Sequence, residues 1–135
     1  MGAQRARRVI SVGGGKGGVG KSIVAANLGV AFAQTGSRTI IVDADLGSAN
    51  QHTLFGIDKP GPTLQGLFDK IIEDLAEAVV PTMVPNLGVV PGSGAVVGAA
   101  NINFQQKLKL IRHIRALDAD VVLIDVGAGV SFNVL

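Results

Sequence analysis

The sequence contains no cysteine among its 135 residues. Disulfide bonds, thiolate-bound zinc and a cysteine-ligated iron–sulfur cluster are therefore excluded for this chain, and the absence is compatible with a cytoplasmic protein. Charged residues are also few, at 16%, and the net charge of +2 comes from basic residues that are scattered rather than massed in one block. The charge pattern therefore argues neither for nor against nucleic-acid binding.

Long uninterrupted apolar runs are missing as well, although apolar residues make up 47% of the chain. No run approaches the roughly 18 apolar residues of a membrane-spanning helix, and the N-terminus leads into a predicted strand rather than an export signal. We therefore expect a soluble protein. The apolar residues form short runs between predicted helices, which is typical of a parallel sheet covered on both faces. Residues 1–135 are expected to belong to a single domain.

A glycine-rich segment, residues 15–22, reads G-K-G-G-V-G-K-S and matches the phosphate-binding pattern G-x-x-x-x-G-K-S. It stands between a strand-like run, Arg8–Val12, and a helix-like run, residues 23–33, which is the context that the motif requires. Its glycines bring backbone N–H groups close to a ligand, and the helix N-terminus adds partial positive charge. The sequence therefore predicts a polyphosphate site formed by Gly15, Lys16, Gly17, Gly18, Val19, Gly20, Lys21 and Ser22.

The last two residues of this segment have the functional groups that a magnesium–polyphosphate complex needs. Lys21 is expected to reach the β- and γ-phosphates as a mobile point charge. The hydroxyl of Ser22 is expected to complete the shell of a Mg²⁺ ion that otherwise keeps its waters.

Three aspartates end or follow predicted strands. Asp43 and Asp45 follow the run that begins at Arg38, and Asp125 ends the run that begins at Val121. Because parallel strands present their carboxyl ends at one edge of a sheet, we expect these carboxylates to converge beside the phosphate loop. Asp125 would hold Mg²⁺ through a water, Asp45 would orient or deprotonate an attacking water, and Asp43 would support the metal shell. Each could instead simply cap the turn that follows it.

The remaining segments predict further elements of an α/β fold. The first helix should end at Gly36 in a left-handed conformation. Residues 64–79 are amphipathic and predict one surface helix, and residues 87–90 predict a strand. Asn103 with Gln106 indicates a capping box that opens a helix through residue 117. The inward side chains of the 64–79 helix are expected to be Leu67, Phe68, Ile71, Ile72 and Leu75. His52 and His113 have no nearby nucleophile or second ligand and receive no role.

These motifs together resemble those of the MinD/ParA class of ATPases within the SIMIBI group. Residues 16–22 resemble its deviant Walker A sequence, which adds a second lysine, here Lys16. Residues 42–50 resemble its switch I, and residues 123–129 resemble its Walker B and switch II, which ends here at Gly129. The three segments occur in the family order, the resemblance runs through the whole chain, and it is greatest for the bacterial MinD/FlhG-like members.

The resemblance implies a Rossmann-like P-loop NTPase, a three-layer α/β sandwich with a mostly parallel central sheet. It implies a cytoplasmic protein that binds ATP and Mg²⁺, dimerises around ATP and separates after hydrolysis, with Lys16 reaching the phosphates of the partner subunit and Gly129 contacting nucleotide. Such proteins position flagella, division machinery or chromosomes, and an activating partner usually triggers hydrolysis. Family members are much longer than this chain, which is expected to be an N-terminal half. The missing C-terminal half would determine whether the protein binds membrane or DNA. It would also determine any peripheral attachment at a membrane or cell pole.

Three other functions remain open. The first is a metal-cluster carrier ATPase of the same superfamily, against which the lack of cysteine in these residues argues. The second is a small-molecule kinase or ligase, and the third is a nucleotide-binding interaction module without turnover. The segment Asp43-Ala44-Asp45-Leu46-Gly47 favours the dimerising switch over the kinase.

Overall fold

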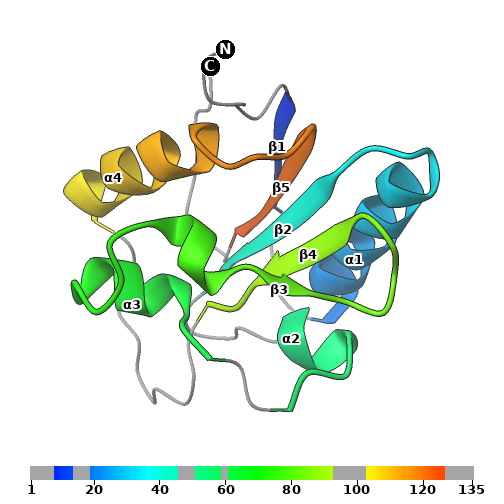
Figure 1. Cartoon of the computed structure of the whole chain (residues 1–135), viewed down its shortest axis with the longest axis horizontal. Coiled ribbons are helices and arrows are strands. Elements are labelled where there is room, and N and C mark those ends of the chain that lie inside the picture. Colours follow the sequence, from blue (N-terminus) through cyan, green and yellow to red (C-terminus); the bar gives the residue numbers. More distant parts are fainter. Residues whose placement is uncertain (1–7, 14–18, 46–50, 59–60, 93–102, 127–135) are drawn as a thin grey trace.

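A computed structural model describes residues 8–13, 19–45, 51–58, 61–92 and 103–126. Within these residues five strands form one sheet in the order β1-β5-β2-β4-β3, with helices on both faces (Figure 1). In chain order the elements are β1 (Arg8–Val12), α1 (Val19–Gln34), β2 (Thr39–Ala44), α2 (Gln51–Leu54), α3 (Leu64–Phe68), the 3₁₀ helix η1 (Leu75–Ala78), β3 (Val80–Pro81), β4 (Leu87–Val90), α4 (Phe104–Arg115) and β5 (Val121–Val126).

The four longer strands run parallel, as predicted. β2 pairs with β5 on one side and with β4 on the other, and β1 pairs with β5. All residues of β2 and β5 are buried. This explains their continuous apolar sequences, because a strand covered on both faces has no solvent side. The fifth strand, β3, pairs antiparallel with β4 and was not predicted. It is two residues long and ends in Pro81. Proline has no backbone N–H to donate, which is tolerated in a strand at the edge of a sheet.

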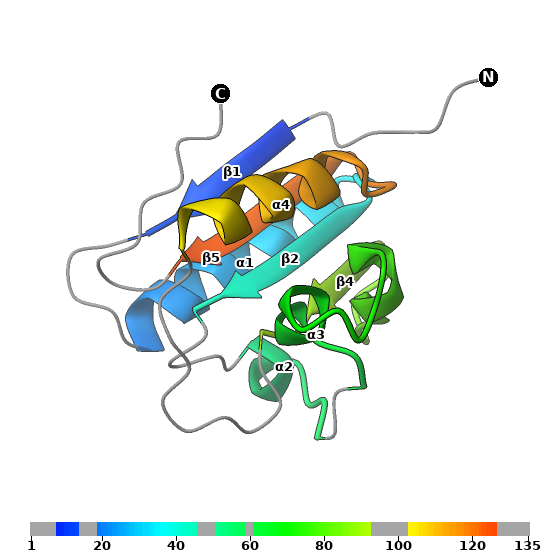
Figure 2. The same cartoon turned by 90° about the vertical axis from the view of Figure 1, so that its left-hand side faces the viewer.

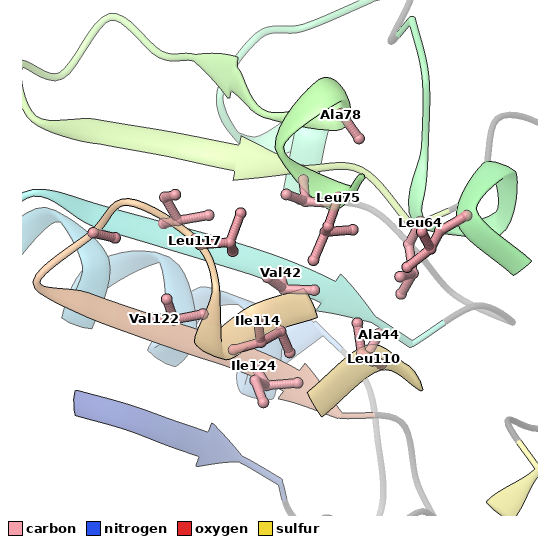
Figure 3. Close-up of a cluster of buried hydrophobic side chains, with 14 of the residues drawn as sticks. Val42, Ala44, Leu64, Leu75, Ala78, Leu110, Ile114, Leu117, Val122 and Ile124 are labelled. Carbon is pink, nitrogen blue, oxygen red and sulfur yellow. The ribbon is translucent and has the colours of Figure 1, made fainter. Parts of the chain in front are cut away.

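Alternate residues of the sheet contact different helical layers, which confirms the predicted sandwich. Ile40, Val42 and Ala44 face the layer formed by α3, η1 and α4. Ile41, between them in sequence, packs with Ala33 of α1 in a second cluster. Figure 2 shows α4 in front of the sheet and α1 behind it, and Figure 3 shows the first of the two clusters. The side-chain period of two therefore decides which layer a strand residue meets.

Two glycines fix the position of α1. A Cβ at Gly29 would lie 2.6 Å from Cδ1 of Ile41, so the absence of a side chain lets the helix approach the sheet closely. Gly36 has φ +94°, which confirms the predicted left-handed cap after the helix. α1 thus lies tightly against β2 with its first turn at the carboxyl ends of the strands.

The prediction of one helix over residues 64–79 was wrong. α3 ends at Phe68, Lys70 adopts φ 61°, and Ile71 donates its N–H to the carbonyl of Gly66 at 2.8 Å, which is a Schellman stop. Ile71 is 76% exposed instead of facing inward. Beyond the stop, the carboxylate of Glu77 accepts the N–H of Asp74 at 3.0 Å and starts a separate turn, η1. Leu67, Ile72 and Leu75 are buried as predicted.

The capping box of α4 is confirmed. The side chain of Asn103 accepts the N–H of Gln106 at 2.8 Å, and the Gln106 side chain accepts the N–H of Asn103 at 2.9 Å. The apolar residues Leu110 and Ile114 of this helix are buried against the sheet. No helix within the described ranges is both long and apolar enough to cross a bilayer.

Candidate nucleotide and metal site

Two buried carboxylates meet at the carboxyl ends of the central strands. Asp43 of β2 and Asp125 of β5 are partners in the parallel register, and both have no exposed surface. They have the same parity as Ile41 and Leu123, which belong to the cluster on the α1 face. Strand alternation therefore directs both carboxylates toward α1 and α2. The predicted convergence of these two aspartates is present in the fold.

The first turn of α1 brings a lysine and a serine to these carboxylates. Nζ of Lys21 forms an ion pair and hydrogen bond with Oδ1 of Asp125 and lies 3.6 Å from Oδ2 of Asp45. The Lys21 side chain is only 5% exposed, so the pairs are largely removed from water. Ser22, the next residue, is buried. Lys21, Ser22, Asp45 and Asp125 therefore gather at one place.

Gln51 is a further member of the site that the sequence did not reveal. It is fully buried at the first position of α2. Its Nε2 donates to Oδ2 of Asp125 at 2.7 Å and to the backbone carbonyl of Ser22 at 2.9 Å. One amide therefore connects α2 to both the first turn of α1 and the end of β5.

The carboxylate of Asp43 binds the backbone of two residues that follow it in the sequence, Asp45 and Gln51. Its Oδ1 accepts the backbone N–H of Asp45 at 3.2 Å, and its Oδ2 accepts the backbone N–H of Gln51 at 3.0 Å. Both oxygens therefore bind backbone donors, one on each side of residues 46–50.

Burial changes the protonation of Asp43 strongly. Loss of solvent raises the pKa of this carboxyl to about 7, the N–H of Gln51 lowers it, and the negative charge of Asp125 raises it further. An ionised Asp43 thus lies in a region where negative charge is costly. A bound cation would relieve that cost.

The donor set fits a magnesium ion bound together with phosphate. Asp43, Asp45 and Asp125 bring three carboxylates to the site, and Lys21 is the cation that the structure pairs with two of them. Oxygen donors are those that Mg²⁺ prefers, and with phosphate present it takes only one or two protein carboxylates. In the part of the chain that the structure describes, no three acidic, histidine or cysteine side chains are arranged to hold one metal ion by themselves, and a magnesium ion shared with phosphate does not require that. The side-chain Oε1 of Gln51 is buried without a hydrogen-bond partner among the described residues.

The other predicted site residues are placed only in part. Val19 and Gly20 begin α1, so the helix starts within the predicted phosphate loop and before the helix-like run expected from residue 23. Gly15, Lys16, Gly17, Gly18 and Gly129 lie outside the described residues.

The two histidines, to which the sequence assigned no role, lie on α2 and α4. His52 of α2 has a buried Nδ1 with no partner within the described ranges. His113 of α4 has its pKa lowered by burial, while the charge of Asp74 raises it. Neither is a partner of the carboxylates in the contacts described above.

A family profile described as "ParA: NUBPL iron-transfer P-loop NTPase" matches residues 5–133. The chain belongs to the ParA family of P-loop NTPases. The match includes the glycine-rich segment at residues 15–22 and the strand ends that carry Asp43 and Asp125. The resemblance to MinD/ParA proteins that the motifs suggested is therefore confirmed.

Curated relatives of this family are similar along most or part of the chain. The antiactivator FleN of Pseudomonas aeruginosa is 33% identical over 137 residues, which cover 100% of this chain and 48% of FleN. The flagellum site-determining protein YlxH of Helicobacter pylori is 29% identical over 92% of this chain and 42% of its own. An iron–sulfur cluster carrier protein of Aquifex aeolicus is 53% identical, but over 38% of this chain and 14% of its own. The chain spans about half the length of FleN.

Solved structures of MinD share the fold. The cell-division ATPase MinD of Pyrococcus furiosus superposes with a TM-score of 0.76 at 32% identity, over 93% of this chain and 52% of that chain. The septum site-determining protein MinD of Pyrococcus horikoshii, complexed with Mg-ADP, gives a TM-score of 0.74 at 29% identity, over 93% and 51%. The ParA-family chain therefore has the MinD-like P-loop fold.

Proposed function

We propose that this chain is the nucleotide-binding half of a Mg²⁺-dependent ATPase that acts as a dimerising switch in spatial positioning. The observation that carries the proposal is the buried register pair Asp43 and Asp125 beside Lys21 and Ser22. This places carboxylates, a cation and a hydroxyl at the N-terminal turn of α1, which is where a phosphate loop delivers its ligand. The similarity to MinD complexed with Mg-ADP supports the choice of nucleotide and metal.

Each side chain of the site has a proposed role in hydrolysis. Lys21 binds the β- and γ-phosphates. To do so, its ammonium group leaves the carboxylates of Asp45 and Asp125. Ser22 and Asp125 hold Mg²⁺, which when bound neutralises phosphate charge, and Asp43 supports them through the backbone that it fixes. Asp45, partly exposed at the end of β2, orients or deprotonates the attacking water.

The phosphate loop and the dimer complete the proposed site. The phosphates are bound by Lys21 together with Gly15, Lys16, Gly17, Gly18, Val19 and Gly20. Gly129, which follows β5 in the sequence, also contacts the nucleotide. Lys16 reaches the phosphates of the partner subunit, where a positive charge stabilises the charge that develops during transfer. Turnover then requires the homodimer.

Hydrolysis by the full-length protein tests the proposed chemistry. We expect single-turnover ATP hydrolysis to fall by at least about 100-fold in Asp45→Asn, since general-base or positioning groups contribute that much. Asp118→Asn is the matched control, because Asp118 precedes β5 and pairs with Arg38 at the opposite edge of the sheet. Equal rates in wild type and Asp45→Asn would refute the role of Asp45, and ATP binding without any hydrolysis would favour a binding module without turnover.

Dimerisation provides a second test. We expect Lys16→Ala to keep nucleotide binding while losing the dimer that wild type forms with a non-hydrolysable ATP analogue, measured by light scattering after size-exclusion chromatography. An unchanged dimer and unchanged turnover would contradict a cross-subunit role for Lys16.

The relatives also support a process. FleN is named an antiactivator and YlxH a flagellum site-determining protein, so we propose that the switch positions flagella, with division machinery or chromosomes as related targets. We propose a cytoplasmic protein with an activating protein partner and peripheral attachment at a membrane or cell pole. Contact with membrane or DNA would use the portion of the relatives' length that this chain does not span.

The alternative is an iron–sulfur carrier ATPase, favoured by the description of the family profile and by the A. aeolicus relative. These 135 residues contain no cysteine to ligate such a cluster. Anaerobic reconstitution of the full-length protein with iron and sulfide distinguishes the two. Charge-transfer absorption from a bound cluster would support the carrier, and its absence together with ATP-dependent dimerisation would support the switch.

A further inference from the structure

Gln51 is a buried amide that joins three parts of the site. Its backbone N–H binds Asp43 at the end of β2, and its side chain binds Asp125 at the end of β5 and the carbonyl of Ser22 in α1. Nothing in the phosphate-loop motif or the acidic strand ends requires a glutamine here. The hydrogen bonds of Gln51 therefore need an explanation beyond the general chemistry of the site.

The hydrogen-bond partners fix which way the amide points. Oδ2 of Asp125 and the carbonyl oxygen of Ser22 are both acceptors, at 2.7 and 2.9 Å, so the NH₂ group must face them. Oε1 then points away from these acceptors and remains buried without a partner among the described residues. A buried carbonyl oxygen left unpaired is energetically costly, so a bound water or ligand donor there would be stabilised.

The amide and the lysine together immobilise the carboxylate of Asp125. Lys21 binds Oδ1 and Gln51 binds Oδ2, so each oxygen of the carboxylate has a side-chain partner. Partners of this kind, which orient a metal-binding group without touching the metal, typically change metal affinity by about 10–100-fold when they are removed. If Lys21 leaves Asp125 to bind phosphate, Gln51 is the described side chain that keeps the carboxylate oriented.

We propose that Gln51 is a positioning residue for magnesium, which orients Asp125 through Nε2 and offers Oε1 to a water of the metal shell. The same residue binds the end of β2 and the first turn of α1, so the Mg²⁺ affinity of the site depends on how α2 is docked. This proposal deepens the proposed function and rests on metal-dependent nucleotide binding by the protein.

The test compares nucleotide affinity with and without metal in the full-length protein. Binding of a fluorescent ADP analogue is measured in excess Mg²⁺ and in EDTA. In Gln51→Met, which keeps length and volume but removes the amide, we expect a roughly 10-fold or greater loss of the Mg²⁺-dependent gain and a much smaller loss of affinity in EDTA. Gln34→Met is the matched control at the exposed last residue of α1, far along the helix from Ser22, and should bind as wild type does.

A double-mutant comparison separates positioning from simple loss of structure. If Gln51 acts mainly through Asp125, then Gln51→Met should remove much less Mg²⁺ dependence in the Asp125→Ala background than in wild type, and the remainder would be the contact of Oε1 with the metal-shell water. Additive losses, or an equal loss of affinity with and without Mg²⁺, would overturn the proposal.

A second variant keeps the test decisive if Gln51→Met does not fold. Gln51→Asn retains the amide but is too short to reach Asp125 and Ser22 together, so we expect a smaller loss of Mg²⁺ dependence than in Gln51→Met. A Gln51→Asn protein with the full Mg²⁺ dependence of wild type would refute the role of Gln51 alone. If wild type itself shows no Mg²⁺-dependent nucleotide binding, the proposed function fails instead.

Discussion

At the scale of single residues, the site is defined by charge that the fold has removed from water. Asp125 is neutralised by Lys21, whereas Asp43 accepts only backbone N–H groups among its described contacts. An ionised carboxylate is stable in the protein interior when it has both a cationic partner and hydrogen-bond donors. Its burial is energetically unfavourable when either is missing. Asp43 satisfies the second condition only, and its raised pKa is the result.

The first prediction concerns the pH dependence of stability in the protein without nucleotide or metal. Because the pKa of Asp43 is about 7 in the folded state and near 3.8 when exposed, the folded state binds the additional proton between these pH values. The free energy of unfolding should therefore fall as the pH rises from about 4 to 7, and stay low above 7. The difference between the two pKa values corresponds to roughly 4 kcal/mol as an upper limit. Chemical denaturation at several pH values measures it.

Asp43→Asn is the informative control for this effect. The substitution removes the titrating group, so the decline in stability between pH 4 and 7 should be smaller than in wild type. Its absolute stability is not the readout, since the amide replaces one acceptor oxygen by a donor. An identical pH profile in both proteins would contradict a raised pKa for Asp43. Mg²⁺ with nucleotide should also reduce the decline, because a cation favours the ionised carboxylate.

The residues of the site differed in how well the sequence predicted them. Lys21 and Ser22 belong to a fixed pattern, and Asp43 and Asp125 end apolar strands, so chain position alone implied their convergence. Gln51 has no such pattern, because α2 is only four residues long and shows no periodicity. A buried glutamine and a solvated one look the same in a sequence. Its role becomes visible only when β2, β5 and α1 are assembled.

At the scale of elements, the turn after α3 stores conformational strain. Lys70 adopts φ 61° in the left-handed region, which costs roughly 1–2 kcal/mol for a residue with a Cβ. We expect Lys70→Gly to raise the free energy of unfolding by about 0.5–1 kcal/mol, because glycine adopts this conformation without that cost. Thermal or denaturant unfolding measures the change.

The matched control for this prediction is Lys70→Ala. Alanine also removes the lysine side chain but keeps the Cβ, so it should give no comparable gain. If alanine stabilised the protein as much as glycine, the effect would come from the lysine side chain and not from the backbone conformation. The comparison isolates the φ angle as the cause.

Elements were predicted well where one local rule decides the outcome. The parallel strands are short apolar runs, two of which carry an aspartate near the carboxyl end, and α4 begins at a capping box, so both are predictable from neighbouring residues. Residues 64–79 failed because their apolar spacing suits a helix, while packing on the sheet favours a stop at Lys70 and a new turn from Asp74. The pair Asp74 and Glu77 was the local signal for that second start.

At the scale of the whole molecule, the sheet is asymmetric. One side ends in the short strand β3, and the other ends in β1, whose only described strand partner is β5. β1 is also less buried than the strands inside the sheet. The chain spans about half the length of FleN and of the MinD structures reported above. Among the described residues, the outer edge of β1 therefore has no strand paired with it.

A polypeptide of these 135 residues alone should therefore associate through β1. Unpaired N–H and C=O groups along an edge strand bind a second strand readily, and a lysine on the edge opposes this. We expect concentration-dependent association in light scattering that does not depend on ATP, which separates it from the proposed nucleotide dimer. Ser11→Lys, at an exposed position of β1, should weaken it, whereas Gln105→Lys, at an exposed position of α4, should leave it unchanged. A monomer at all concentrations, or equal association in both variants, would show that the β1 edge does not mediate self-association.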